Sequence, residues 1–414
     1  MEQFKQIMCG VRDHLTKFLI PFIAFAGPLL AVAEGPGTYF VPPKGTDNVV
    51  SQAQRRAGAP KRTVAFLGGS ITEMDGFRPR VMKLLREKYP SVDFVEISSG
   101  LSSTCSDTGA MRFKADILGK GRPDLLIVDE VVNDDQDGHF DRRRAVRGME
   151  GVLRSARKAN PAMALVVSLF VNHGQYNQLT NGKTPFHYAV HAEVARHYGA
   201  AVADVGGALA ASAKTGGLDW KGYRDCHPSP EGCDFAAAVV MKAVGGVFDP
   251  LGKPKAVSLP PRLDAASYDG ATFIPFGRVV RDTAWQVSRP DWAKVPGGKR
   301  KRFVEGDSLW TETDGATFRL PFRGTALAAI LTAGPDAGDI EVSVDGGAWT
   351  RHRLFTPYSK SLHYPFTVLL AEGLAAGEHT VSVRACAAER EGKRQCAVRI
   401  YRLAEVLADV PVTP

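Results

Sequence analysis

The first part of the chain alternates between short apolar runs and longer stretches in which apolar residues recur at helical spacing. Uninterrupted apolar runs are typical of strands that a parallel sheet buries on both faces, and the stretches between them predict amphipathic helices. The expected strands are Val64–Leu67, Val92–Ile97, Asp124–Asp129, Ala164–Phe170 and Ala201–Val205, and the expected helices are Arg78–Lys88, Arg142–Lys158, Phe186–Tyr198 and Cys233–Val247. The pattern predicts a doubly wound, three-layer α/β domain over residues 62–249.

The pattern changes after residue 249. Residues 250–262 contain four prolines and predict a linker. Beyond them, short runs alternate between apolar and polar residues and are separated by turn signals, which favours antiparallel strands. The expected strands are Ala316–Phe322, Ala326–Thr332, Ile340–Val344, Phe366–Leu370, His379–Arg384 and Ala397–Tyr401. Residues 263–414 are therefore predicted to form a mainly antiparallel, jelly-roll-like β-sandwich.

The N-terminal residues resemble a removable export signal. Basic residues precede the apolar stretch Phe18–Val32, which ends in the small-residue pattern Ala31-Val32-Ala33. We predict a signal peptide over residues 1–33 and a lead draped over the surface at residues 34–61, and hence a secreted or periplasmic protein. The alternative is an uncleaved membrane anchor, although the stretch contains prolines and is short for a spanning helix.

Composition and charge limit the classes of binding partner that the sequence favours. The chain is 44% hydrophobic and 23% charged, as in an ordinary globular protein. Its net charge of +8 is scattered except at Lys299–Arg302, which we interpret as a solvated loop rather than a polyanion site. No nucleic-acid motif is present. An acidic polysaccharide partner is compatible with the positive net charge. The sequence does not indicate the oligomeric state.

Five cysteines would remain after cleavage of the signal. Cys386 and Cys396 flank a polar turn between two alternating runs, so a hairpin disulfide is plausible in an exported protein. Cys226 could bond either Cys233 or Cys105, and one thiol stays unpaired. No His/Cys spacing matches a structural zinc site.

Four polar segments follow the ends of predicted strands or lie in the last connection of the α/β domain. They are Gly68–Ser70, Ser98–Thr108, Val131–Asp134 and Asp225–Pro228. In a parallel sheet these positions meet at the carboxyl edge, where open α/β folds bind their ligands. The two glycines before Ser70 predict a tight turn that uses the left-handed backbone region.

These segments bring together the groups needed for nucleophilic catalysis. A serine hydroxyl becomes a good nucleophile when an imidazole takes its proton, and a carboxylate can orient that imidazole. We assign Ser70 as nucleophile, His227 as base and Asp225 as orienting acid. The developing oxyanion needs donors, for which we nominate the backbone N–H groups of Ser70 and Ser103 and the Asn133 side chain.

The same segments resemble the SGNH (GDSL-like) hydrolase superfamily, in its GGSIT variant. The resemblance implies a flavodoxin-like α/β/α fold, the roles given above for Ser70, Asn133 and His227, and no metal or organic cofactor. Two positions depart from the pattern. Ser103 stands where the family has a glycine whose N–H serves the oxyanion. Arg224 stands where it has the acid, so either Asp225 orients His227 or the site works as a Ser–His dyad.

Together these features predict an exported serine hydrolase that cleaves ester-linked acyl groups, most plausibly O-acetyl groups of carbohydrates. The alternatives are a catalytically weak carbohydrate-binding or surface protein on this scaffold, and a lipid esterase or lysophospholipase. Asp134, Asp135 and Asp137 are expected to cap a helix or line a solvated turn rather than bind a metal. His191 and Asn172 are candidates for the pocket lining. In the sandwich, Trp349, Tyr358, His363 and Tyr364 are candidates for stacking on sugar, although core packing explains them as well.

Overall fold

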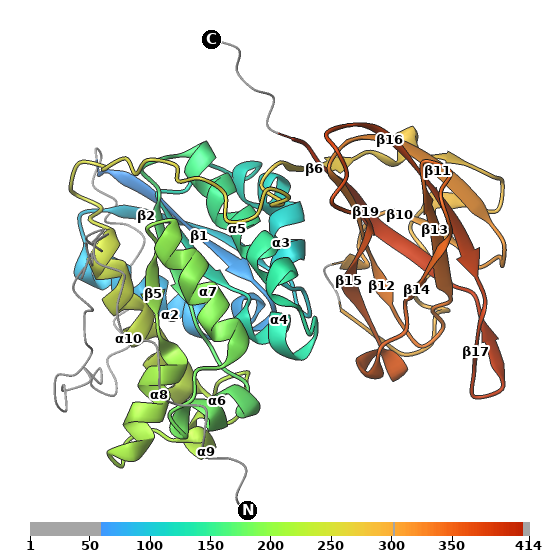
Figure 1. The fold of residues 1–414 in the computed structure, drawn as a ribbon. Helices are drawn as coiled ribbons and strands as arrows, with labels where there is room; N and C mark the ends of the chain where they lie inside the picture. The colour runs from blue at the N-terminus through green and yellow to red at the C-terminus, as the bar shows by residue number, and fades with distance from the viewer. Residues whose placement is uncertain (1–58, 301–302, 409–414) are drawn as a thin grey trace, which may run out of the picture. The chain divides into compact units, whose positions relative to one another are not determined.

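The computed structural model describes residues 59–300 and 303–408 (Figure 1). The expected signal peptide and residues 34–58 of the lead lie outside the described residues. Within the described part of the chain, no helix is both long and apolar enough to cross a membrane.

The N-terminal part is built on a five-stranded sheet in the order β2-β1-β3-β4-β5, with every neighbouring pair parallel. This order is that of flavodoxin-like folds, whose ligands bind at the carboxyl ends of the strands. The strands are β1 (Lys61–Gly68), β2 (Asp93–Gly100), β3 (Leu125–Asp129), β4 (Ala164–Ser168) and β5 (Ala201–Ala203). The predicted doubly wound α/β fold is confirmed.

Helices cover both faces of this sheet (Figure 1). One layer contains α3 (Ser106–Phe113), α5 (Arg142–Ala159) and α7 (Phe186–His197), and the other contains α2 (Phe77–Lys88), α8 (Val205–Lys214) and α10 (Pro230–Val247). The remaining helical segments are α1 (Ser70–Glu73), η2 (Lys114–Leu118), α4 (Val131–Gln136), α6 (His173–Thr180) and α9 (Trp220–Tyr223). The four predicted helices are confirmed to within a few residues, whereas α3, α4, α6 and α8 were not predicted.

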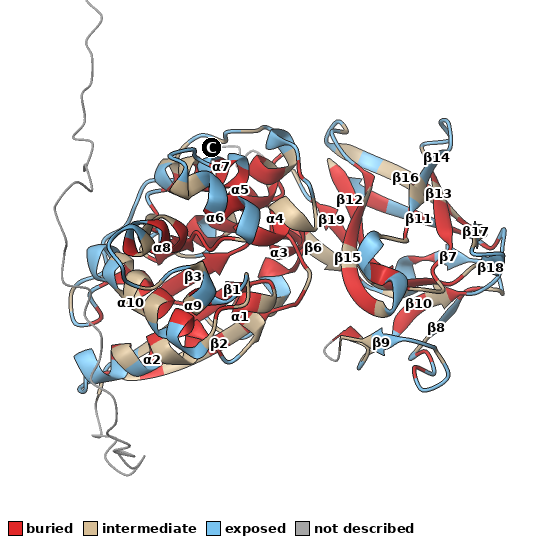
Figure 2. Ribbon diagram, turned by 90° about the horizontal axis from the view of Figure 1, so that it is seen from below, coloured by how far each residue is buried: buried red, intermediate tan, exposed pale blue. Residues whose placement is uncertain are grey.

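The reason for these omissions is clearest in α3. All eight of its residues are buried although half of them are polar or charged, so its polar positions do not mark an exposed face as they do in the predicted helices. By contrast, β3 and β4 are buried at every position, as the uninterrupted apolar runs predicted. Figure 2 shows buried residues concentrated in the sheet and on the inner sides of the helices.

The proline-rich segment after α10 forms no helix or strand, and it lies against α5. The Glu150 carboxylate on α5 is fully buried and accepts hydrogen bonds from the backbone N–H groups of Leu263 and Asp264 and from the Tyr198 hydroxyl. A few residues further on, buried Asp269 forms an ion pair with Arg154 of α5. The segment is thus anchored to the α/β part by charged groups.

The C-terminal part consists of two facing sheets. One has the order β8-β10-β19-β12-β15-β9, with β6 also paired to β19, and the other has the order β14-β13-β16-β11-β7. All pairs are antiparallel except β15 with β9. The strands are β6 (Ala271–Ile274), β7 (Val280–Arg281), β8 (Gln286–Ser288), β9 (Gly298–Lys299), β10 (Ser308–Thr311), β11 (Thr317–Gly324), β12 (Ala326–Ala333), β13 (Asp339–Val344), β14 (Thr350–Arg353), β15 (Leu362–Ala371), β16 (Gly377–Cys386) and β19 (Val398–Val406), and a hairpin is formed by β17 (Ala388–Arg390) and β18 (Lys393–Gln395).

The sandwich core follows the pattern of strand alternation. Along β11, buried Phe318, Leu320 and Phe322 alternate with exposed residues, so one face of the strand enters the core. Leu327 and Leu331 of β12 in the other sheet belong to the same apolar cluster. The predicted antiparallel β-sandwich is confirmed. The disulfide expected between Cys386 and Cys396 is not formed, because all five cysteines of the described residues are free thiols.

Candidate active site

The turn between β1 and α1 places Ser70 at the carboxyl edge of the sheet. Gly69 precedes α1 with φ −82°, and Gly68 is not in the left-handed region either. The expected use of that region is therefore wrong, and the glycines are needed for close approach instead. A Cβ on Gly69 would lie 2.2 Å from Asn133 Oδ1, and one on Gly68 would lie 2.5 Å from the Asp129 carbonyl oxygen.

His227 lies in the loop between α9 and α10, and its Nε2 is 2.7 Å from Ser70 Oγ. The loop is held on both sides of the histidine. The Arg224 guanidinium donates to the His227 carbonyl oxygen over 2.6 Å, and Ser229 caps α10 by accepting from the Gly232 N–H. Residues 157 positions apart in sequence are thus brought within hydrogen-bond distance.

Asp225 does not reach the far nitrogen of the imidazole by a hydrogen bond. Its Oδ1 lies 3.8 Å from His227 Nδ1 and instead accepts from the His227 backbone N–H over 2.6 Å. The nearest side-chain atom recorded at Nδ1 is Cys226 Sγ, at 3.5 Å. The preceding residue, Arg224, has φ 93°, which turns the chain sharply before the aspartate. The Asp225 carboxylate is thus placed to bond the loop backbone rather than the imidazole.

Asn133 lies next to Ser70 and is oriented by a neighbouring acid. It is buried, its Oδ1 covers Gly69, and its Nδ2 donates to Asp137 Oδ2 over 2.5 Å. An amide nitrogen carries two hydrogens, so one remains for another acceptor. Asn133 and Asp137 are four residues apart, which places them on the same side of the α4 turn.

Ser103 lies in the loop after β2, which is tied to α1. The neighbouring Ser102 donates its N–H and its hydroxyl to the Glu73 carboxylate at the end of α1. The N–H of Ser103 itself has no acceptor within hydrogen-bond distance among the described residues. Ser103 has φ 67°, in the left-handed region that glycine adopts with least strain. Ser103 thus adopts a backbone conformation that glycine would adopt with less strain.

We expect Ser103→Gly to raise the free energy of unfolding by about 0.5–1 kcal/mol, because glycine relieves the left-handed strain although it also increases the entropy of the unfolded chain. Activity should stay within about twofold of wild type, since the proposed contribution is made by the backbone N–H. Chemical denaturation and ester hydrolysis measure the two effects. Ser102→Gly is the matched control: it removes a hydroxyl that bonds Glu73, and it should destabilise. A destabilised Ser103→Gly variant would contradict this account.

The acids after β3 are all engaged by protein donors. Fully buried Asp134 accepts from the Ser106 N–H and hydroxyl over 2.8 and 2.7 Å, and its Oδ2 is 2.8 Å from Nε2 of buried His191. Asp135 accepts from Asn172 Nδ2 over 2.7 Å. Only the Asp134 contact resembles a helix cap, because Ser106 begins α3, and the alternative of a solvated turn is wrong for this buried residue. These contacts also place His191 and Asn172 behind the Ser70–His227 pair as supports for α3 and α4.

Two further side chains near the site are unsuited to metal binding or nucleophilic attack. The ligand atoms of Asp225, Cys226 and His227 lie within 4.8 Å of one another. Burial raises the pKa of the Cys226 thiol, and the imidazole already has Ser70 Oγ as partner, so the set fits a metal poorly. Burial also raises the pKa of Cys105 well above its usual range, and its Sγ donates to the Asn133 carbonyl oxygen. Cys105 is therefore a buried, structural residue.

Burial lowers the pKa of His227 below its ordinary value of 6.5. Asp225 and Asp137 oppose this effect, and the positive charges of Arg300 and Arg224 add to it. A neutral imidazole at neutral pH is the form that accepts a proton from serine. Arg300 belongs to the basic run Lys299–Arg302, so the charge of this run reaches the site even though its sequence indicated only a solvated loop.

We expect kcat/KM to be constant above the pKa of His227 and to fall only below pH 6.5, as the imidazole becomes protonated. Arg300→Gln removes a positive charge that disfavours the imidazolium, so the acidic limb of the pH profile should move to higher pH by a few tenths of a unit. Arg289→Gln, an exposed change in the same part of the chain, should leave the limb in place. A limb that moves to lower pH in Arg300→Gln would contradict the assignment.

Residues 66–235 match the model of the GDSL-like Lipase/Acylhydrolase family. The match lies within the α/β part of this chain, which is therefore similar to that family. Two structures of a two-domain esterase (CEX) active on acetylated mannans align with the GDSL-like chain over 85% of its length. The one co-crystallised with mannopentaose has a TM-score of 0.68 and 20% identity over 92% of that chain. The other has a TM-score of 0.66 and 22% identity over 93%. A comparison with curated proteins found no match.

At this level of identity the likeness shows a shared fold, and it extends over both parts of the chain. This chain is an esterase with the SGNH fold followed by a β-sandwich. Sequence reasoning missed the supporting roles of Asp137 and of the buried Asp134–His191 pair. The four-residue spacing of Asn133 and Asp137 was visible in the sequence, but the partner of Asp134 comes from α7, more than 50 residues away.

Proposed function

We propose that this esterase removes O-acetyl groups from carbohydrates through an acyl-enzyme formed on Ser70. The observation that carries the proposal is the 2.7 Å distance between Ser70 Oγ and His227 Nε2 at the carboxyl edge of the sheet. The carbohydrate part is supported by the two-domain esterase of the same fold that is active on acetylated mannans.

The reaction would proceed in two steps. Ser70 Oγ attacks the ester carbonyl carbon as His227 Nε2 takes its proton, and the tetrahedral intermediate collapses when the imidazolium protonates the leaving sugar oxygen. Water then attacks the acetyl-serine, with His227 again accepting a proton, and releases acetate and free Ser70. Each step passes through an oxyanion, which the N–H groups of Ser70 and Ser103 and the second hydrogen of Asn133 Nδ2 would hold.

Asp225 would act on the loop rather than on the ring. Because its carboxylate accepts from the His227 backbone N–H, it would stabilise the loop that carries the histidine and would counter part of the burial effect on its pKa. The Ser–His dyad is therefore the form of the mechanism that we favour.

The test is the release of acetate from acetylated polysaccharides. Acetylated mannan, acetylated xylan and acetylated pectin are incubated with wild-type protein and with Ser70→Ala, and free acetate is measured over time. We expect release from at least one polymer by wild type only. A series of p-nitrophenyl esters then ranks acetyl against longer acyl groups. Preference for long chains with no acetate release from any polymer would replace this proposal with a lipid esterase.

We also propose that the protein is exported and that it consists of two domains. Cleavage after residue 33 would give a mature chain that begins at Glu34. The α/β domain would span residues 62–249 and the sandwich residues 263–414. N-terminal sequencing of the protein recovered outside the cytoplasm tests the first of these statements.

A further inference from the structure

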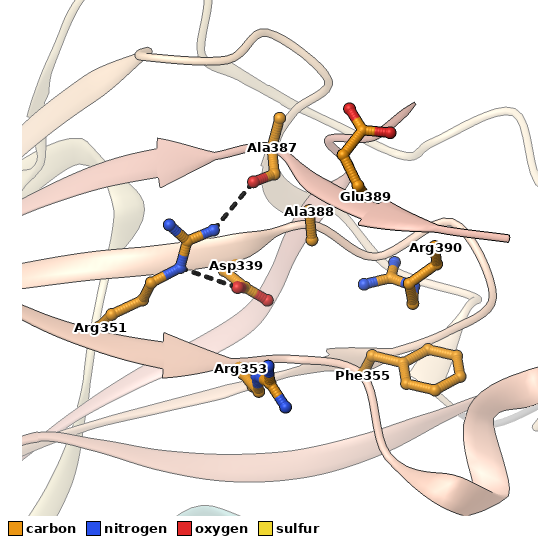
Figure 3. Close-up of a pocket in the computed structure, with 8 residues that line it drawn as sticks. All are labelled: Asp339, Arg351, Arg353, Phe355, Ala387, Ala388, Glu389 and Arg390. Atoms are coloured by element: carbon orange, nitrogen blue, oxygen red, sulfur yellow. Dashed lines mark hydrogen bonds and ion pairs between the residues drawn. The ribbon is translucent and has the colours of Figure 1, made fainter. Parts of the chain in front are cut away.

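The β-sandwich contains a cavity of about 500 Å³ that is lined by three arginines (Figure 3). Its walls are formed by β13, by β14, by Phe355 and by the residues that lead into and form β17. The lining residues are Asp339, Arg351, Arg353, Phe355, Ala387, Ala388, Glu389 and Arg390. None of them belongs to the Ser70–His227 site.

One of the three arginines is already neutralised. Arg351 Nε donates to Asp339 Oδ2 over 2.9 Å, and its Nη2 donates to the Ala387 carbonyl oxygen over 2.9 Å (Figure 3). This pair fixes the side of the cavity formed by β13 and β14. It does not neutralise the guanidinium groups of Arg353 and Arg390.

Arg353 and Arg390 have no carboxylate partner among the described residues. Arg353 is exposed on β14, two positions after Arg351 and therefore on the same face of the strand. Arg390 donates to the Ala337 carbonyl oxygen, but its Nε is buried and has no acceptor in the described part of the chain. Burial lowers its pKa, and the negative charges of Asp339 and Asp336 oppose this effect only in part.

The Arg390 guanidinium is also held in a fixed plane, because its central carbon lies 4.5 Å from the centre of the Phe355 ring. The remaining acid of the lining, Glu389, is exposed and forms no ion pair with any described residue. After the Arg351–Asp339 pair is set aside, two cations face one solvated carboxylate. The cavity is therefore electropositive and has a rigid donor, an accessible donor and an aromatic ring.

We propose that this cavity binds the carboxylate of an acidic saccharide, a uronate, as a second site beside the esterase site. A guanidinium presents donors in a planar fork that matches a carboxylate. Arg353 and Arg390 supply these donors, and the Phe355 ring holds the plane of the Arg390 guanidinium. That the carboxylate belongs to a saccharide rests on the proposed function, whereas the binding of an anion does not.

The test is direct binding to the full chain by isothermal titration calorimetry at low and moderate salt. The probes are a tetrasaccharide of glucuronate, its carboxyl-reduced neutral counterpart and sodium acetate. We expect the uronate to bind at least tenfold more tightly than either of the others, and its affinity to fall as salt rises. Arg353→Gln and Arg390→Gln should each weaken uronate binding about tenfold or more. Arg319→Gln, which removes an exposed cation from β11, should change it less than twofold.

Arg353→Gln is the decisive variant, because Arg353 has no partner in the described structure to lose, whereas Arg390 contributes to packing. Equal affinity for the uronate and its neutral counterpart, or uronate binding unchanged in Arg353→Gln, would overturn the proposal. Acetate binding as tight as uronate binding would reduce the cavity to an anion site and overturn the saccharide part. Hydrolysis of p-nitrophenyl acetate should be unchanged in Arg353→Gln, so a failure here is distinguishable from a failure of the Ser70 mechanism.

Discussion

Replacing Ser70 by alanine is expected to lower kcat/KM for p-nitrophenyl acetate by about 10⁴-fold or more. Loss of the nucleophile in a serine hydrolase removes the acyl-enzyme route altogether, and what remains is the modest catalysis provided by binding and the oxyanion donors. The fold should be retained, because Ser70 is only partly buried and the one side-chain hydrogen bond of its hydroxyl within the described part of the chain is to the His227 ring. Steady-state kinetics and a thermal melt measure the two quantities.

Ser103→Ala provides the matched control for this loss. It deletes a serine hydroxyl at the same site but keeps the backbone N–H, so its activity should remain within about tenfold of wild type. A fluorophosphonate probe should label wild type and Ser103→Ala at Ser70 and should leave Ser70→Ala unlabelled. Comparable activities of wild type and Ser70→Ala, or labelling at a different serine, would show that the nucleophile is misassigned.

The contrast between His227 and Asp225 has the second-largest expected effect. His227→Ala should lower kcat/KM by about 10⁴-fold or more, since it removes the base that lies 2.7 Å from Ser70 Oγ. Asp225→Ala should lower it by less than about tenfold, because the carboxylate is 3.8 Å from Nδ1 and bonds the backbone instead. In a triad, loss of an effective acid costs about 10⁴-fold.

Asp225→Asn separates the two roles of this side chain. It retains an oxygen that can accept from the His227 N–H but has no charge to stabilise an imidazolium. We expect Asp225→Asn to be closer to wild type than Asp225→Ala, and both to keep most of the activity. A loss of about 10³-fold or more in Asp225→Asn would mean that the carboxylate moves onto Nδ1 during the reaction, and the triad would then be the correct mechanism.

The fold could be predicted where the burial of an element produces a regular repeat of apolar positions in the sequence. Strands buried on both faces and helices with one apolar face were located to within a few residues, because their patterns extend over a whole element. Helix α3 leaves no such signal, since it is buried on all sides. The anchoring of the connection between the two parts could not be predicted either, because it depends on which charged residues of α5, such as Glu150 and Arg154, face the segment after residue 260.

The site divides in the same way. That Ser70, Ser103, Asn133 and His227 come to the same edge follows from parallel topology and could be predicted. The relation of Asp225 to the imidazole could not, because it depends on the backbone of one residue, Arg224, at φ 93°. The two glycines before Ser70 were recognised as necessary for the wrong reason. Their requirement is the proximity of Asn133 and of the β3 backbone, which only the folded chain reveals.

The buried Glu150 carboxylate determines where the chain can be truncated without loss of its hydrogen bonds. Its backbone donors lie at residues 263–264, beyond the proline-rich segment. A catalytic fragment that stopped at residue 249 would keep every residue of the active site and yet leave a charge on α5 without those two donors. A fragment extended to residue 270 would keep them, together with the ion pair to Asp269. We therefore expect a fragment that ends at residue 270 to be more stable than one that ends at residue 249.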